Sequence, residues 1–304
     1  MSLKYDDITG LKSHLCADLL TINPLDPKAR GLINSGGTTN KFCTTIDPPV
    51  SQLFTIWNCG ETGSNYFEPK KFQNFAESQV LYVSSTNNTD NANMIFEFIV
   101  DSTGEGVTGY ATLNGNTQVP IVDGDGQPIL IYDISRGSVF DKKNKNANGY
   151  IYISEQGNTT AGKPNDLSKV HLFIDNGGLI KKGQSEIGTL MIPRGKVGFI
   201  SNTHSSIKRA STGPSFFDTA VDATVYLVAE SIDPVTGETY INNYKGSVEL
   251  FSDGSSAFLL KLDSLIVPEM TRLYIKAQVF YNNVADGAGL SASFDIDILD
   301  KIDV

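Results

Sequence analysis

From residue 78 onward, hydrophobic and polar positions alternate along the chain in short runs. In the segment 271–282, TRLYIKAQVFYN, the odd positions from 273 to 279 are aliphatic and the even positions from 274 to 280 are aromatic or polar. A period of two predicts a strand with one buried face. Similar runs, rich in β-branched and aromatic residues and bounded by Gly, Asn or Asp, predict further strands. The predicted strands cover residues 80–85, 94–101, 109–114, 117–122, 129–140, 149–154, 169–175, 186–193, 196–209, 222–231, 245–252, 256–268, 271–282 and 289–299.

Two of these segments make more detailed predictions. In 94–101, MIFEFIVD, alternation predicts that Ile95, Glu97 and Ile99 face one side and that Phe96, Phe98 and Val100 face the other. One face would be fully apolar and the other mixed, as in a sheet that is covered on one side. Between 109–114 and 117–122 lies the dipeptide Gly115-Asn116, which predicts a tight hairpin turn.

The N-terminal quarter of the chain has a different pattern. In 8–22, ITGLKSHLCADLLTI, apolar residues recur every three or four positions and prolines follow at 24 and 27, which predicts a helix. The stretch from there to about residue 75 is irregular and contains scattered aromatic residues. We expect these residues to anchor an extended arm onto a folded body, in this chain or in a neighbouring subunit. They are Phe42, Trp57, Tyr66, Phe67, Phe72 and Phe75.

The predicted strands fall into two groups, and the stretch 175–185, DNGGLIKKGQS, is the natural joint between them. Because no helical pattern interrupts the strands, the fold class is predicted to be all-β. We expect two antiparallel β-sandwich, jelly-roll-like domains preceded by an N-terminal helix and an extended arm. The predicted boundaries are 1–77 for the helix and docking arm, 78–182 for the first sandwich and 183–304 for the second.

Composition excludes several classes of protein. The chain has 304 residues, 40% of them hydrophobic, and a formal net charge of −10. A disordered chain would have fewer hydrophobic residues, and an excess of acidic over basic residues argues against a nucleic-acid partner. No apolar run is long enough for a membrane span, and the first residues, MSLKYDD, lack the pattern of a signal peptide. We therefore expect no membrane partner and synthesis in the cytoplasm.

Motifs for catalysis or metal binding are weak. There is no nucleophile elbow, no phosphate-binding loop and no dinucleotide-binding glycine motif. The segment Asp123–Gly126 begins like a calcium loop, but Gln127 stands where the next oxygen ligand belongs, so a hairpin turn is favoured. The cysteines have no CxxC spacing and are expected to be unpaired thiols. We therefore predict a protein that is not an enzyme, with no catalytic, cofactor-binding or metal-binding residue. The scattered candidates are His14, His171, His204, Cys16, Cys43 and Cys59.

Two binding or catalytic alternatives stay open at this point. Exposed aromatic side chains such as Trp57, Tyr66 and Phe67 could stack on sugars, which would make the chain a carbohydrate- or receptor-binding module. A hydrolase of surface glycans would instead need paired carboxylic acids in a groove, which a sequence does not reveal.

Several segments together resemble a family of tailed-bacteriophage virion structural proteins. The resemblance lies in Lys41-Phe42-Cys43, in Ile56-Trp57-Asn58, in the hairpin region 84–121, and in the strand-turn-strand segment Ile192-Pro193-Arg194-Gly195-Lys196. The more loosely matching region 149–165 and the final strand ASFDIDIL also fit. The chain departs from the family at the first helix, at Cys43 where a glycine is usual, and in the insertions DKKNKNAN and KRASTGPSF.

This resemblance implies a non-enzymatic component of a phage virion, such as a capsid decoration, neck or tail-associated protein. It implies many symmetry-related copies and hence a homo-oligomer, with other virion proteins as partners. The N-terminal residues would dock onto the capsid, neck or tail, and the aromatic residues of the arm would supply assembly contacts. Localisation would be the virion, after synthesis and assembly in the bacterial host cytoplasm.

Overall fold

The computed structural model describes residues 38–46, 48–141, 146–178, 182–208, 221–251, 255–256, 266–281 and 289–300. The predicted helix 8–22 lies outside these residues. Within them the fold is all-β, with antiparallel strand pairs in every sheet and three single-turn 3₁₀ segments, η2 (Gly63–Asn65), η3 (Phe75–Glu77) and η4 (Leu167–Lys169). The predicted all-β class is confirmed. Among the described residues, no helix has the length and hydrophobicity needed to cross a membrane.

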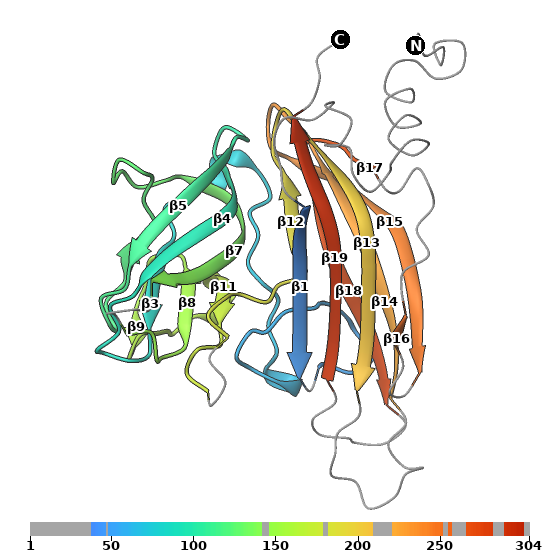
Figure 1. Ribbon diagram of the computed structural model, residues 1–304, viewed down its shortest axis with the longest axis horizontal. Coiled ribbons are helices and arrows are strands. Elements are labelled where there is room, and N and C mark those ends of the chain that lie inside the picture. The colour runs from blue at the N-terminus through green and yellow to red at the C-terminus, as the bar shows by residue number, and fades with distance from the viewer. Residues whose placement is uncertain are drawn as a thin grey trace, which may run out of the picture.

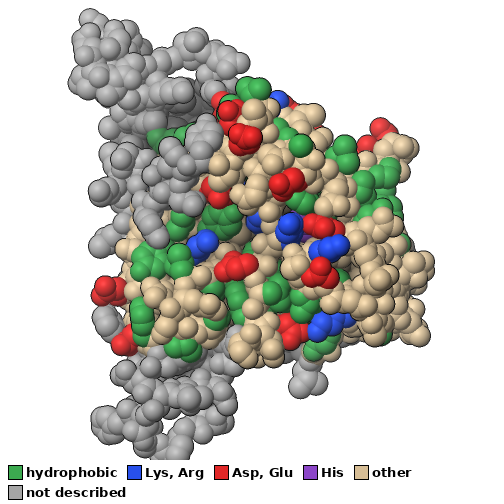
Figure 2. All heavy atoms as spheres, turned by 180° about the vertical axis from the view of Figure 1, so that it is seen from behind, with side chains coloured by type: hydrophobic (Ala, Val, Ile, Leu, Met, Phe, Trp, Pro, Cys, Tyr) green, Lys and Arg blue, Asp and Glu red, His purple; other side chains and the backbone are tan. Residues whose placement is uncertain are grey.

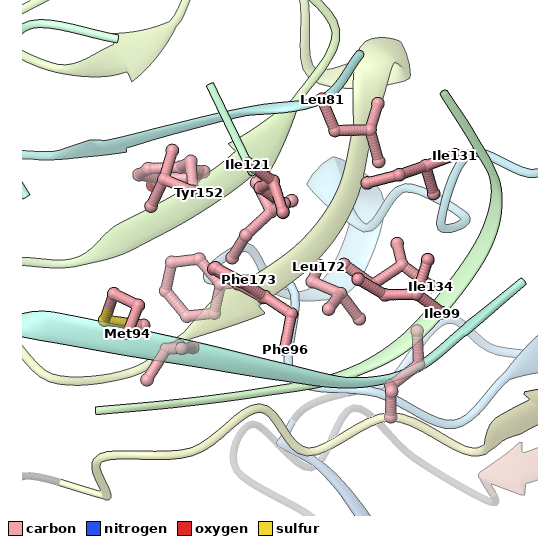
Figure 3. Packing of buried hydrophobic residues seen from close by; sticks show 14 of the residues in the cluster. Leu81, Met94, Phe96, Ile99, Ile121, Ile131, Ile134, Tyr152, Leu172 and Phe173 are labelled. Atoms are coloured by element: carbon pink, nitrogen blue, oxygen red, sulfur yellow. The ribbon is translucent and has the colours of Figure 1, made fainter. Parts of the chain in front are cut away.

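Strands β3 to β11 form what we call the first body. Two sheets face each other there, ordered β11-β8-β3-β6 and β5-β4-β7, beside the small pair β10-β9. Figure 3 shows Phe96 from β4 and Phe173 from β11 pointing into the space between the sheets. The strands are β3 (Tyr82–Ser85), β4 (Asn93–Asp101), β5 (Gly106–Thr112), β6 (Val119–Pro120), β7 (Ile131–Asp141), β8 (Ile151–Ser154), β9 (Thr159–Thr160), β10 (Lys163–Pro164) and β11 (Val170–Ile174).

The remaining strands form the second body, which lies beside the first in Figure 1. One sheet has the order β1-β19-β13-β16, with β17 also on β13, and the other has the order β12-β18-β14-β15, with β2 on β18. The strands are β1 (Thr38–Ile46), β2 (Leu53–Thr55), β12 (Thr189–Ile192), β13 (Lys196–Lys208), β14 (Val221–Ile232), β15 (Thr239–Phe251), β16 (Ser255–Ser256), β17 (Ile266–Val267), β18 (Thr271–Tyr281) and β19 (Gly289–Asp300).

The predicted strands agree well with those observed. Every predicted range overlaps an observed strand, although 256–268 is described only at its two ends. In β18 the alternation is confirmed, because Leu273, Ile275, Ala277 and Val279 are fully buried. The hairpin turn is confirmed too: Thr117 N donates to Asn114 O at 3.1 Å, and Gly115 has a positive φ of 56°.

One expected alternation is wrong. In β4 the buried side chains are Met94, Phe96, Ile99 and Val100, so Ile99 lies on the core side instead of opposite Phe96. The pairing of β4 with β5 shifts register between Phe96 and Ile99, and Phe98 has a positive φ of 55°. This β-bulge interrupts the alternation, and the consecutive residues Ile99 and Val100 after it are both buried.

The segment 38–77 of the predicted arm packs on the body of this same chain. Strand β1 pairs with β19 along its whole length, from Thr38 opposite Asp297 to Ile46 opposite Gly289, and β2 pairs with β18. The blue β1 beside the red β19 in Figure 1 makes this pairing visible. The domain boundaries predicted at 77/78 and 182/183 stay predictions.

Candidate functional site

The six predicted contact residues do not form one exposed patch. Trp57 and Phe72 are buried in the core of the first body, and Tyr66, Phe67 and Phe75 are partly buried against it. Phe42, on β1, is the most exposed of the six, with 38% of its surface accessible. As contacts with another subunit these residues stay predictions.

The buried aromatic residues hold the segment 53–77 in place. Trp57 Nε1 donates to the carbonyl of Phe67 at 3.0 Å, and the two rings meet edge to face with centroids 5.2 Å apart. Phe75 makes a similar contact with Tyr132 of β7, at 4.8 Å. The anchoring that the sequence predicted therefore occurs within this chain.

A cluster of charged residues joins the two bodies. Arg272, on β18, is fully buried, and its Nε donates to Asp133 Oδ2 on β7 at 2.7 Å. Its Nη1 donates to Glu230 Oε2 on β14 at 2.8 Å, and its Nη2 donates to the carbonyl of Phe72 at 3.2 Å. One guanidinium thus uses its fork of donors to connect groups from both bodies.

Two lysines approach the same part of β7. Lys71 Nζ lies 3.5 Å from Asp133 Oδ1 and donates to the carbonyl of Ile134 at 3.0 Å. Lys41, on β1, is buried and donates to the carbonyl of Ser135. We call Lys41, Lys71, Asp133, Glu230 and Arg272 the charged junction.

The electrostatics of the charged junction follow from burial and pairing. Burial raises the pKa of Asp133, but Lys71 and Arg272 outweigh it and hold that pKa below its usual value. Burial lowers the pKa of Lys41 to about 7, and the nearby Arg136 and Lys71 add to this decrease. Removal of one partner from a buried ion pair leaves the other charge uncompensated, which is strongly destabilising.

A cleft of about 390 Å³ opens at a different place, beside the end of β8. It is lined by residues from several segments: Thr44, Thr45, Asn58, Cys59, Gly60, Glu61, Thr62, Thr86, Tyr150, Tyr152, Lys163, Phe173, Asp175 and Lys182.

Aromatic rings form one wall of the cleft. Tyr150 is 40% exposed and stacks on Phe173, with ring centroids 5.8 Å apart and an interplanar angle of 25°. Tyr152 meets the same Phe173 ring at 5.1 Å. Gly60 lies against Phe173 with φ +74°, and a Cβ there would stand 2.8 Å from Phe173 Cζ. A glycine is therefore required for this close approach.

The polar side chains of the cleft are paired with one another. Lys163 Nζ lies 2.5 Å from Glu61 Oε1, and Asn58 Nδ2 donates to Asp175 Oδ2 at 3.4 Å. Lys182 Nζ contacts Glu186 at 2.6 Å beside the cleft. The cleft thus contains two carboxylic acids, Glu61 and Asp175, each with a partner that fixes its position.

The other candidates for chemistry are placed as follows. His171 is 1% exposed, and its burial lowers its pKa to about 4, so it is neutral at physiological pH. Cys43 and Cys59 are buried free thiols, and burial raises the pKa of Cys43 to about 12. His14 and Cys16 lie outside the described residues. The prediction of a protein without catalytic residues stays a prediction.

The turn predicted at Asp123–Gly126 can also be located. Asp123 Oδ1 accepts hydrogen bonds from the backbone N–H groups of Asp125 and Gln127, at 2.9 and 2.8 Å, so its carboxylate closes a turn. In the described part of the chain, no group of three His, Cys, Asp or Glu side chains is arranged to hold a metal ion. On the face in Figure 2, positive and negative side chains are interspersed near the centre.

Sequence reasoning missed both the charged junction and the cleft. Arg272 lies at the start of the alternating segment 271–282, two residues before Tyr274 and thus on the same face as the polar positions. The cleft residues come from stretches near 45, 60, 86, 150, 163, 175 and 182, which have no common motif. The one available signal was the repeated Tyr-x-Tyr of 150–152, whose two rings both contact Phe173.

Comparisons with known proteins give little further guidance. No family model and no curated protein matches the sequence. Among solved structures, the chain is similar to the VP2 subviral particle of infectious bursal disease virus, with 11% identity, 88% of this chain and 72% of that chain covered, and a TM-score of 0.18. It is also similar to a carbohydrate-binding module of the β-sandwich superfamily, with 13% identity, 86% and 98% coverage, and a TM-score of 0.18. TM-scores this low carry no argument about function.

Proposed function

We propose that the chain is a non-enzymatic structural component of a bacteriophage virion, present in many copies and bound to other virion proteins. The charged junction is the observation that supports this role most. It connects Arg272 of one body to Asp133 of the other through buried ion pairs, which fits a stiff spacer in an assembly. The resemblance of several segments to tailed-phage virion proteins is the reason for proposing a phage particle as the assembly.

In this proposal the two bodies act as two antiparallel β-sandwich domains. The docking segment is shorter than the arm 1–77, because residues 38–46 are a strand of the second body and Trp57 is buried in the core. We assign docking onto the capsid, neck or tail to residues 1–37, with the exposed Phe42 as a neighbouring contact. The protein would be made in the host cytoplasm and reside in the virion.

The test is incorporation into particles of the phage whose genome encodes the chain. Purified particles are expected to contain the full chain in many copies by quantitative mass spectrometry. Deletion of residues 1–37 is expected to abolish incorporation, while the truncated chain keeps its β-rich circular dichroism. Phe42→Ala is expected to weaken incorporation, whereas Phe280→Ala, which removes a similarly exposed ring from β18, serves as the matched control. Particles that lack the chain, or normal incorporation of the truncated chain, would contradict the proposal.

A further inference from the structure

We propose that the cleft beside Tyr150 binds an uncharged pyranose sugar of a larger glycan. This inference goes beyond the structural role, because a spacer protein does not need such a cleft. It rests on the size of the cleft, on its aromatic wall and on the pairing of its charged groups.

The size of the cleft suits a sugar. Its volume of about 390 Å³ lies at the lower end of the range of ~300–1,000 Å³ that is usual for small-molecule sites. The cleft is lined by four threonines and an asparagine besides its charged groups. Sugar hydroxyls both donate and accept hydrogen bonds, so they need a mixed set of partners of this kind.

The aromatic wall supplies the surface on which a pyranose packs. One face of a pyranose ring carries mainly C–H groups, and this face packs against the flat, electron-rich face of an aromatic ring. Tyr150 is the most exposed of the lining aromatic residues, with 40% of the residue surface accessible, whereas Tyr152 and Phe173 are buried.

Tyr150 is also held in position before any ligand arrives. Phe173 stacks on the Tyr150 ring, and the backbone N of Tyr150 donates to Thr86 Oγ1 at 2.9 Å. Gly177 approaches so closely that a Cβ there would stand 3.0 Å from Tyr150 Cδ2. Because the ring is already ordered, its immobilisation adds little entropic cost to binding.

The charges of the cleft favour an uncharged ligand. Lys163 pairs with Glu61 and Lys182 pairs with Glu186, while Asp175 accepts a hydrogen bond from Asn58, so the charged groups in and beside the cleft already have partners. An anionic ligand would meet the carboxylates and a cationic ligand the ammonium groups, whereas sugar hydroxyls can bond to both. Asn58 and Asp175, which already share a hydrogen bond, offer a donor and an acceptor side by side.

The experiment is isothermal titration of the full-length chain with glucose, galactose, N-acetylglucosamine and rhamnose, followed by disaccharides of the sugar that binds. Saturable binding of at least one sugar is expected. Tyr150→Ala is expected to weaken it at least tenfold, and Tyr150→Phe is expected to bind within about threefold of the wild type, because the stacking face remains.

Tyr110→Ala is the matched control. Tyr110 is 38% exposed but lies on β5 and does not line the cleft, so its loss is expected to leave binding unchanged. Unaltered thermal unfolding of all three variants would show that the effects are local. No saturable binding of any sugar, or equal binding by Tyr150→Ala and Tyr110→Ala, would overturn the inference. Neither of these outcomes alters the test of virion incorporation.

Discussion

The two bodies of this chain use antiparallel sheets in different ways. In the second body, β13, β14, β15, β18 and β19 are each 11 to 13 residues long and pair with few interruptions. In the first body, only β7 reaches 11 residues, and β3, β6, β8, β9 and β10 have two to four. The structure of the first body therefore depends more on side-chain contacts and loops than the structure of the second body does.

The two bodies are therefore suited to different roles, one to stiffness and the other to placing side chains around a cleft. Long paired strands satisfy their backbone groups locally and provide stiffness, whereas the loops between short strands can place side chains around a cleft. Tyr150, Phe173 and Asp175 lie at or next to the ends of short strands of the first body. The charged junction and a hydrophobic cluster that includes Met191 of β12 and Ile232 of β14 hold the loop-rich body on the long-stranded one.

The largest decrease in the free energy of unfolding is expected from Arg272→Met. This substitution removes the group that connects β7 with β14 and leaves Asp133 and Glu230 buried with fewer partners. Loss of one partner from a buried pair costs about 3–5 kcal/mol. Chemical denaturation should show a decrease of that size in the free energy of unfolding, with the first body unfolding earlier than the second.

Lys196→Met is the matched control for that substitution. Lys196 pairs with Asp300 within the second body, but both side chains are exposed. An exposed pair contributes about 0–1 kcal/mol, so this variant should unfold almost as the wild type does. Equal destabilisation by the two substitutions would show that the charged junction has no special part in stability.

A smaller decrease in the free energy of unfolding, with a local cause, is expected from Gly60→Ala. The added Cβ would stand 2.8 Å from Phe173 Cζ, at a backbone φ of +74°. Strain and overpacking together should cost about 1–3 kcal/mol, and a displaced Phe173 should also weaken sugar binding at Tyr150. Gly195→Ala is the control, because its φ is +71° but nothing lies within 4 Å of the added Cβ. It should therefore show a smaller loss and unchanged binding.

The last prediction concerns the pH dependence of the free energy of unfolding. The folded chain releases the proton of Lys41 near pH 7, whereas an unfolded lysine keeps its proton to about pH 10. The unfolded state therefore binds more protons in this window, and Lys41 makes the free energy of unfolding rise with pH by up to about 1.4 kcal/mol per unit between pH 7 and 9. Lys41→Met should flatten this rise in denaturation curves recorded at several pH values. The exposed Lys163 offers the control: a Lys163→Met chain that lost the same slope would contradict the assignment to Lys41.

Much of the fold could be predicted from local patterns. Alternation located β18 and β19, because one face of each strand is apolar and the other polar. Strand β1 was not predicted, because its buried side chains are Lys41, Cys43 and Thr45, and this set does not form an apolar face. Its partner β19 is also about 250 residues away in the sequence, and long-range pairing leaves no local signal.

The sites were harder to predict for the same reason. Alternation assigns Arg272 to the polar face of β18, which is usually exposed. Here both faces of the first part of β18 are buried, because the first body covers the polar one. The cleft likewise depends on the sheet order β11-β8-β3, which brings Tyr150 and Phe173 together from separate segments.

The most direct test of the account is differential scanning calorimetry of the unmodified full-length chain. If the charged junction makes one mechanical unit of the two bodies, a single transition is expected, with equal calorimetric and van't Hoff enthalpies. The Arg272→Met chain should instead show two transitions, the first from the loop-rich body. Two separate transitions in the unmodified chain would contradict the claim that buried charges join the bodies into one stiff spacer.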